Sequence, residues 1–192
     1  MSIPEGNDMK VTDILIREHG LILRALENLA EARDQIEKGL PPPKEFFEKA
    51  LWFLSEFADK FHHFKEEYLM FGLLALKSEG ALDGPIGTLR YQHDRCRKCI
   101  NEMTRSLNGY ADSDDIATTS LLENLAAYVS LLRRHIHEED RKFFQMALKE
   151  LSKEEEEILM KQFKKEGEKM GDQKFYDKCR NLIDEMDALL NR

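Results

Sequence analysis

The sequence predicts an all-α protein, with an antiparallel up-down four-helix bundle followed by two additional C-terminal helices. Apolar residues recur at helical spacing along several long segments, whereas no segment alternates apolar and polar residues as a half-buried strand does. Residues that interrupt helices are rare and grouped, since the five prolines lie at position 4, at 41–43 and at 85. The 192 residues are enough for one domain with a well-buried core.

The breaks divide most of the chain into four long segments. These cover residues 12–38, 44–78, 86–108 and 114–149. A Gly-Leu-Pro-Pro-Pro sequence separates the first two, a Gly-Pro pair precedes the third, and a glycine-containing turn precedes the fourth. Short connections of this kind favour helices that pack against their neighbours in a bundle.

A capping box opens the C-terminal part of the chain. Ser152 and Glu155 have the spacing at which two side chains satisfy each other's backbone N–H groups, so a fifth helix is expected to begin there. Gly167 and Gly171 are expected to end it before a sixth helix over about 173–190. We therefore expect an N-terminal extension over 1–11, the bundle over 12–149, and a helical extension over 150–192 that packs on the bundle.

Charge and composition exclude several classes of function. The formal net charge of -8 argues against binding to nucleic acid, and no apolar run approaches the roughly 20 residues that span a bilayer. The first ten residues lack the basic and then apolar plan of a signal peptide. Three cysteines do not suggest a disulfide framework. We expect a cytoplasmic protein with no membrane partner.

Two copies of one short pattern point to a metal site. His62 precedes Glu66 by four positions, and His135 precedes Glu139 in the same way 73 positions later. Residues four apart lie on one face of a helix, so each pair offers an imidazole and a carboxylate on the same side. Each pair is followed by an aromatic residue at the same offset.

Helical projection at about 100° per residue places a histidine on or near each apolar face. His19 lies within the face of the first segment, and His93 lies close to the face of the third. In the fourth segment Glu139 is central to the face and His135 lies close by. His137 points to the opposite side.

The second segment allows two registers. Its projected apolar face contains Leu51, Leu54, Phe57, Ala58, Phe61 and Tyr68. His62 lies at the edge of that face and His63 lies well outside it. We therefore predict His62 and Glu66 as metal ligands, and we expect His63 and Glu67 either behind the ligands or on the surface.

Burial of these groups without a partner would be unfavourable. An unpaired ionised carboxylate in an apolar core costs several kcal/mol. A metal removes this cost because it binds neutral imidazoles and ionised carboxylates. Iron and manganese suit such a mixed set of nitrogen and oxygen ligands, and zinc stays open as an alternative.

The ordered motifs resemble the hemerythrin-like, or HHE cation-binding, family over about residues 12–148. The resemblance rests on Glu18-His19, the sequence 61–67, His93, and the sequence 135–140. It implies an antiparallel four-helix bundle that holds two non-haem irons with carboxylate and oxo or hydroxo bridges.

Carried over to this chain, the resemblance also implies which residues serve which iron. His19 and His62 would serve one ion, and His93 and His135 the other. Glu66 and Glu139 would bridge the two.

One position departs from the oxygen-carrying members of the family. They have a second histidine one turn after the first in the third helix, where this chain has Arg97, which stays protonated and cannot bind a metal. We expect the second iron to have one protein ligand fewer, or a neighbour such as Tyr91 or Cys96, or a water molecule, to fill the gap. An open position favours reaction with dioxygen, peroxide or nitric oxide, and Phe143 is expected to help keep the pocket dry.

We expect a non-haem di-iron protein that binds, senses or reacts with dioxygen or a related small oxidant. No catalytic residue is assigned, and an enzyme that reduces peroxide or nitric oxide stays open. The alternatives are an iron-handling or iron-sensing bundle with a labile site, and a metal-free helical interaction module. The sequence identifies neither the physiological reductant nor the oligomeric state.

Overall fold

The computed structural model describes residues 9–77 and 80–191, and every regular element within them is helical. The prediction of an all-α protein is therefore confirmed. The elements follow the chain in this order: α1 (Val11–Glu37), α2 (Lys44–Phe53), η1 (Leu54–His63), η2 (Lys65–Met70), α3 (Phe71–Leu74), α4 (Asp83–Ala111), α5 (Asp115–Glu138), η3 (Glu139–Phe143), α6 (Phe144–Glu150), α7 (Lys153–Met170) and α8 (Gln173–Leu190). The η elements are π-helical.

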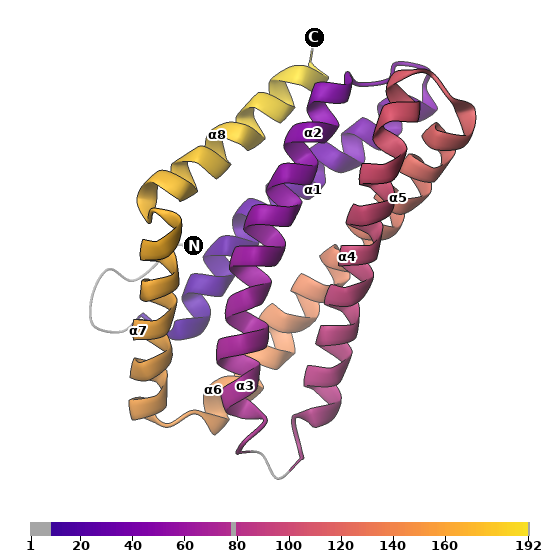
Figure 1. The fold of residues 1–192 in the computed structure, drawn as a ribbon. Coiled ribbons are helices and arrows are strands. Elements are labelled where there is room, and N and C mark those ends of the chain that lie inside the picture. The colour runs from indigo at the N-terminus through magenta and orange to yellow at the C-terminus, as the bar shows by residue number, and fades with distance from the viewer. Residues whose placement is uncertain (1–8, 78–79, 192) are drawn as a thin grey trace.

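These elements form four long segments and two flanking helices (Figure 1). One long segment is α1, the second runs from α2 to α3, the third is α4, and the fourth runs from α5 to α6. They lie side by side with short connections at the two ends of the molecule, while α7 and α8 follow one side of it. Helix α8 contacts α1 and α2, and α7 contacts α1 and η2.

Local sequence explains where several helices begin and end. The Asp114 side chain accepts hydrogen bonds from the first free N–H groups of α5. Ser152 and Glu155 form the reciprocal capping box at the start of α7, as predicted. Gly171 ends α7 with a φ of 101°, a left-handed conformation that suits glycine.

The apolar core consists of two clusters, and the buried histidines lie between them. Along α1, Leu15 belongs to one cluster and Ile22 to the other, with His19 between them. The same order recurs along α4, where Leu89 and Cys96 flank His93. A polar layer therefore crosses the middle of an apolar bundle.

No helix among the described residues is long and apolar enough to cross a membrane.

Candidate metal centre

The π-helical segments place the histidines and carboxylates of the second and fourth long segments. His62 and His63 end η1, Glu66 lies in η2, and Glu139 begins η3. A π-helix forms i→i+5 hydrogen bonds, so each residue turns the chain by less than the 100° of an α-helix. Consecutive side chains consequently point in more similar directions.

This geometry corrects the projection of the second segment. His62 and His63 are each only 1% exposed, so the expectation that His63 could lie on the surface is wrong. Tyr68, which the projection placed on the apolar face, is 67% exposed. Both differences arise because the projection assumed α-helical turns throughout.

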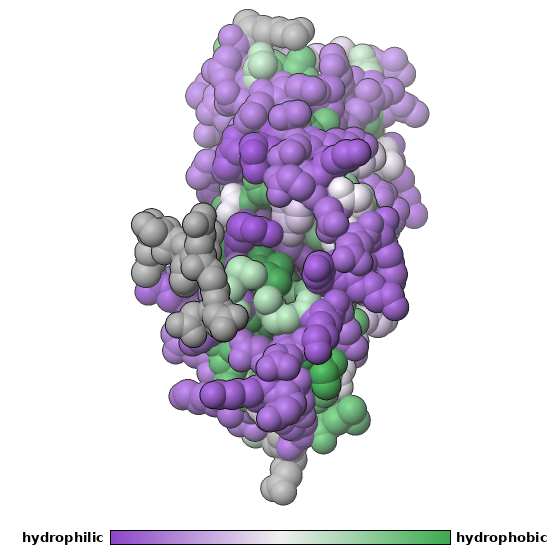
Figure 2. Space-filling view, turned by 90° about the vertical axis from the view of Figure 1, so that its left-hand side faces the viewer, coloured by the Kyte–Doolittle hydropathy of each residue, from purple (hydrophilic) through white to green (hydrophobic). Residues whose placement is uncertain are grey.

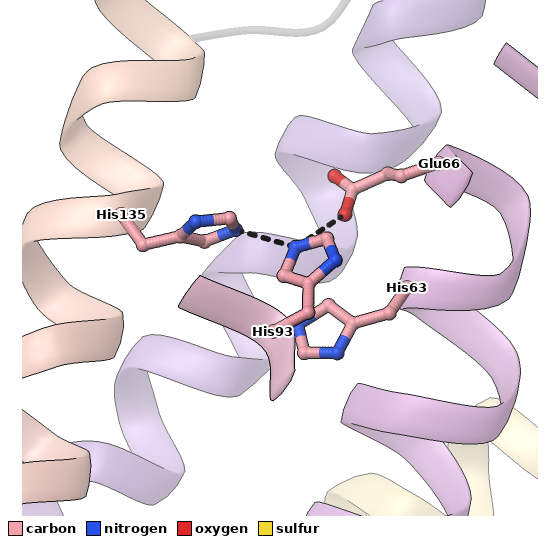
Figure 3. A group of neighbouring side chains, drawn as sticks. All are labelled: His63, Glu66, His93 and His135. Atoms are coloured by element: carbon pink, nitrogen blue, oxygen red, sulfur yellow. Dashed lines mark hydrogen bonds and ion pairs between the residues drawn. The ribbon is translucent and has the colours of Figure 1, made fainter. Parts of the chain in front are cut away.

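The structure brings together all six predicted ligands and adds His63. They form two buried groups, and within each group the donor atoms all lie within 4.8 Å of one another. The first group contains His19, His62, Glu66 and Glu139, and the second contains His63, Glu66, His93 and His135. Figure 3 shows the second group, whose side chains converge from three helical segments. His137 is exposed and belongs to neither group.

Glu66 lies between the two groups. Its Oε1 atom is 3.3 Å from Nε2 of His62 and 3.8 Å from Nε2 of His19, whereas its Oε2 atom is 3.5 Å from Nε2 of His93. Its two oxygens therefore face different sets of imidazoles.

Glu139 also faces both groups. Its Oε2 atom is 3.0 Å from Nε2 of His135 and 3.3 Å from Nε2 of His19. The carboxylate thus faces an imidazole from each group, and both of its oxygens are buried without a hydrogen-bond partner in the described chain.

Every buried imidazole is held by its Nδ1 atom. The Nδ1–H groups donate to carboxylate or amide oxygens at 2.6–3.3 Å, in the pairs His19–Asp140, His62–Glu18, His63–Asp59, His93–Glu67 and His135–Gln92. Metal-binding histidines typically donate their other ring N–H to such an oxygen, which fixes the tautomer and the ring orientation. When these rings are neutral, each Nε2 carries a lone pair that faces the centre.

These lone pairs would repel one another without a cation. Nε2 of His93 and Nε2 of His135 are 3.0 Å apart, although both rings use their Nδ1–H elsewhere. Among the described residues, Nε2 of His19 and of His63 and both oxygens of Glu66 have no hydrogen-bond partner. Buried polar atoms are normally paired, so this donor set fits a metal ion.

The same proximity perturbs the pKa values of these groups. Burial lowers the pKa of His19, but the hydrogen bond to Asp140 and the close contact with the Glu139 carboxylate outweigh burial and raise the pKa to about 10. Burial raises the pKa of Glu66, but the neighbouring His62, His93 and His19 outweigh it and hold the pKa well below its usual value.

The second group behaves differently. Burial and the neighbouring imidazoles hold the pKa of His93 well below its usual value, and burial lowers that of His63. These rings are neutral at neutral pH, the form in which a histidine binds a metal.

Aromatic rings close the centre on one side. Phe144 stacks on His19 with ring centroids 5.7 Å apart, and Phe71 stacks on His93 at 6.2 Å. Phe143 is buried and packs edge-on against Phe71. These rings keep bulk water from the imidazoles.

Arg97 has a structural role at the position where a histidine was missing. It forms ion pairs with Asp59 and Glu67, the residues that hold His63 and His93. The expectation that Tyr91 fills the gap is wrong, because Tyr91 is 64% exposed.

Cys96 is buried but belongs to neither donor group. Burial raises the pKa of Cys96 to about 12, and it also raises the pKa of Cys99. Both thiols therefore stay protonated and unreactive.

A hydrogen-bond network around Glu18, which the sequence motifs did not predict, holds His62 in place from outside the centre. Glu18 accepts the His62 Nδ1–H at 2.9 Å, and its other oxygen pairs with the buried ammonium of Lys65 and accepts the Tyr176 hydroxyl at 2.5 Å. Tyr176 belongs to α8 and is 158 positions from Glu18. Asp59 and Gln92 carried a local signal, since they precede His63 by four positions and His93 by one, but no local pattern connects Tyr176 with the site.

Comparison with known proteins agrees with this geometry. A family model described as the hemerythrin HHE cation-binding domain matches residues 10–147. The uncharacterized proteins Mb2018 of Mycobacterium bovis and Rv1995 of Mycobacterium tuberculosis are each 26% identical over 130 residues, which cover 68% of this chain and 50% of either relative. The chain thus spans about half the length of these relatives, and no solved structure matches it significantly. The resemblance seen in the histidine motifs is confirmed by the family match, and the chain belongs to the hemerythrin HHE cation-binding domain family.

Proposed function

We propose that the centre holds two iron ions and that the protein binds or reacts with dioxygen or a related small oxidant. The observation that carries this proposal is the convergence of five Nε2 atoms and two carboxylates that have few partners of their own. Imidazole and carboxylate ligands from facing helices are the donor set of di-iron bundle proteins. Iron bound there would supply a redox-active position for a small oxidant.

We assign the ligands of each ion from these two groups. His19 and His62 would hold one ion, and His63, His93 and His135 would hold the other. Glu66 and Glu139 would be shared, since each faces imidazoles from both groups.

This assignment changes which ion is expected to have an open coordination position. The absence of a histidine at Arg97 led us to expect a missing ligand beside His93 and His135, but His63 lies there instead. The ion held by His19 and His62 has one imidazole fewer, so an exogenous ligand is expected on that side.

The described residues limit what reaches the centre. Phe71 and Phe144 cover the imidazoles, and a cavity of about 330 Å³ ends on Leu89 and Phe143, one helical turn from His93 and Glu139. The aromatic rings over the imidazoles favour a small neutral molecule over a hydrated ion.

Metal analysis of anaerobically purified protein tests the proposal, followed by an absorption spectrum before and after air is admitted. We expect about two irons per chain, in accordance with the two donor groups, and a new visible band in air. A single zinc, or no metal after iron loading, would contradict the di-iron assignment.

Further measurements separate this function from its alternatives. Turnover of hydrogen peroxide with an electron donor would identify a catalyst, whereas a reversible spectral change without turnover would identify a carrier or sensor. Rapid loss of iron to a weak chelator would favour an iron-handling role. The exposed His137, changed to Ala, is the matched control for ligand variants because it lies two positions from His135 and outside both groups.

A further inference from the structure

A groove separates α1 and η1 from the two C-terminal helices, and it lies outside the metal centre. Its cavity has a volume of about 370 Å³ and is lined by residues of α1, η1, η2, α7 and α8 and by Met9 and Asp172. A second cavity of about 190 Å³ adjoins it and shares Arg17 and Tyr176 with it. Ligand sites commonly occur between helices of bundles, in clefts of this order of size.

The groove is cationic although the chain is acidic. The formal net charge of the chain is -8, yet Arg17, Lys161 and Lys164 line the cavity, with Asp172 as its lining carboxylate. Within residues 9–77 and 80–191, no carboxylate lies within 4.0 Å of these three cations. Lys161 and Lys164 are three positions apart on α7 and thus share one helical face.

The groove also has an apolar wall. The rings of Phe61 and Phe163 line it together with Ile14 and Met160. Figure 2 shows an apolar patch surrounded by hydrophilic residues on the side of the molecule that carries α7 and α8. Cationic groups beside an apolar wall match a ligand that carries a negative charge on an apolar body.

We propose that this groove binds a small organic anion with an aromatic body. Its ring would pack on Phe163 and Met160, and its anionic group would lie near Lys161 and Lys164. Such a site favours a small molecule over nucleic acid, because the cavity is small and the chain as a whole is acidic.

The position of the groove connects it with the centre. Lys65 and Tyr176 line the cavity, and both contact Glu18, which holds the Nδ1–H of His62. The wall of the groove therefore lies two hydrogen bonds from His62, one of the proposed ligands, a connection that rests on the proposed function. Binding of the anion itself requires no metal.

Fluorescence titration with two matched probes tests the site. 1-Anilinonaphthalene-8-sulfonate has an aromatic body and one negative charge, and N-phenyl-1-naphthylamine has the same rings without the charge. We expect the full chain to bind one sulfonate probe with at least about tenfold higher affinity than the neutral probe, and the difference to shrink as salt is added. Equal affinities would overturn the proposal, because charge would then play no part.

Variants locate the binding. The double variant Lys161→Ala and Lys164→Ala is expected to weaken sulfonate binding by about fivefold to tenfold, as the loss of two exposed charges predicts. Lys165→Ala is the matched control, since Lys165 is exposed on α7 but does not line the cavity. Equal weakening by the control, or none by the double variant, would overturn the proposal.

Circular dichroism on each variant excludes binding to unfolded chains. The titration needs no iron, so its failure would leave the di-iron assignment unaffected.

Discussion

Each buried imidazole is held by Nδ1, and this leaves Nε2 as the atom that faces the centre. Four of the five acceptors are carboxylates and the fifth is the amide of Gln92, and only Asp59 lies one helical turn from the histidine that it holds. Because the acceptors are themselves buried or half-buried, they fix the ring planes before any ion binds. We therefore expect the metal affinity of the centre to depend on these outer residues as well as on the proposed ligands.

His63 gives the sharpest test at the scale of a single residue. We expect His63→Ala to reduce the iron content from about two ions per chain to about one, because only the group of His93 and His135 loses an imidazole. Iron per chain is measured on protein loaded anaerobically. His137→Ala, an exposed histidine in the fourth segment, should keep both ions. A His63→Ala protein with two tightly held irons would show that His63 is not a ligand.

Glu66 should behave differently from His63. Glu66→Ala is expected to lose both irons, since its two oxygens face the two groups. Metal analysis and the visible spectrum report the loss. Glu123→Ala, on the exposed face of α5, serves as the carboxylate control. Retention of one full iron by Glu66→Ala would mean that the carboxylate serves one ion only.

At the scale of elements, the π-helical stretches account for what the sequence could and could not predict. The breaks and caps placed the long helices within a few residues of their observed ends. An apolar pattern with a period of 3.6 residues carries no signal for i→i+5 hydrogen bonds, so the projection misplaced His63 and Tyr68. Where turns were α-helical, as at His93 and His137, projection and burial agree.

Helix α8 should influence the centre through one hydroxyl group. Tyr176→Phe removes the hydrogen bond to Glu18, which leaves Lys65 as the partner of that oxygen and loosens the contact between Glu18 and His62. We expect iron affinity to fall by up to about tenfold and stability by about 1 kcal/mol. A chelator competition and a denaturant titration measure the two effects.

A matched control variant and the absorption spectrum of the loaded protein complete this test. Tyr68→Phe alters an exposed tyrosine and should change neither quantity. The absorption band of the loaded protein should shift in Tyr176→Phe, because the electron donation of His62 depends on its hydrogen bond. A loss of stability with an unchanged spectrum and affinity would show that Tyr176 only packs.

At the scale of the whole molecule, metal binding is expected to depend on pH. His19 keeps its proton up to about pH 10 when no ion is bound, because its contacts with Asp140 and Glu139 outweigh burial. Binding must release this proton, so affinity should rise by about tenfold per pH unit below that value. Competition titrations at three pH values between 7 and 9 check the slope. A flat profile would exclude His19 as a protonated competitor of the ion.

The same shift predicts the opposite trend for the metal-free protein. The folded pKa of about 10 lies above the unfolded value of 6.5, so the stabilisation is fully present below pH 6.5 and is lost as pH rises through 10. Urea titrations of chelated protein should therefore show a falling free energy of unfolding across that window. Rising stability there would contradict the assignment.

The sequence predicts the histidines and glutamates of the polar layer, but not the residues that hold them in place. Spacing within one helix identified His62 with Glu66 and His135 with Glu139 as pairs, since i and i+4 side chains share a face. The sequence motifs gave Lys65 no role, yet it is buried against Glu18 and the ring of Phe61. Contacts across 47 or 158 positions leave no periodic trace in the sequence, so they require the folded chain.

The large sequence separation between Glu18 and Tyr176 has a consequence while the protein is being synthesised on the ribosome. Residues 10–147, which contain every side chain of the two donor groups, are synthesised before residue 176. Until then Glu18 has Lys65 and His62 as partners but lacks the hydroxyl from α8. An ion acquired by the nascent chain would thus be held in a less firmly braced pocket, and docking of the last helix would complete the centre as synthesis finishes.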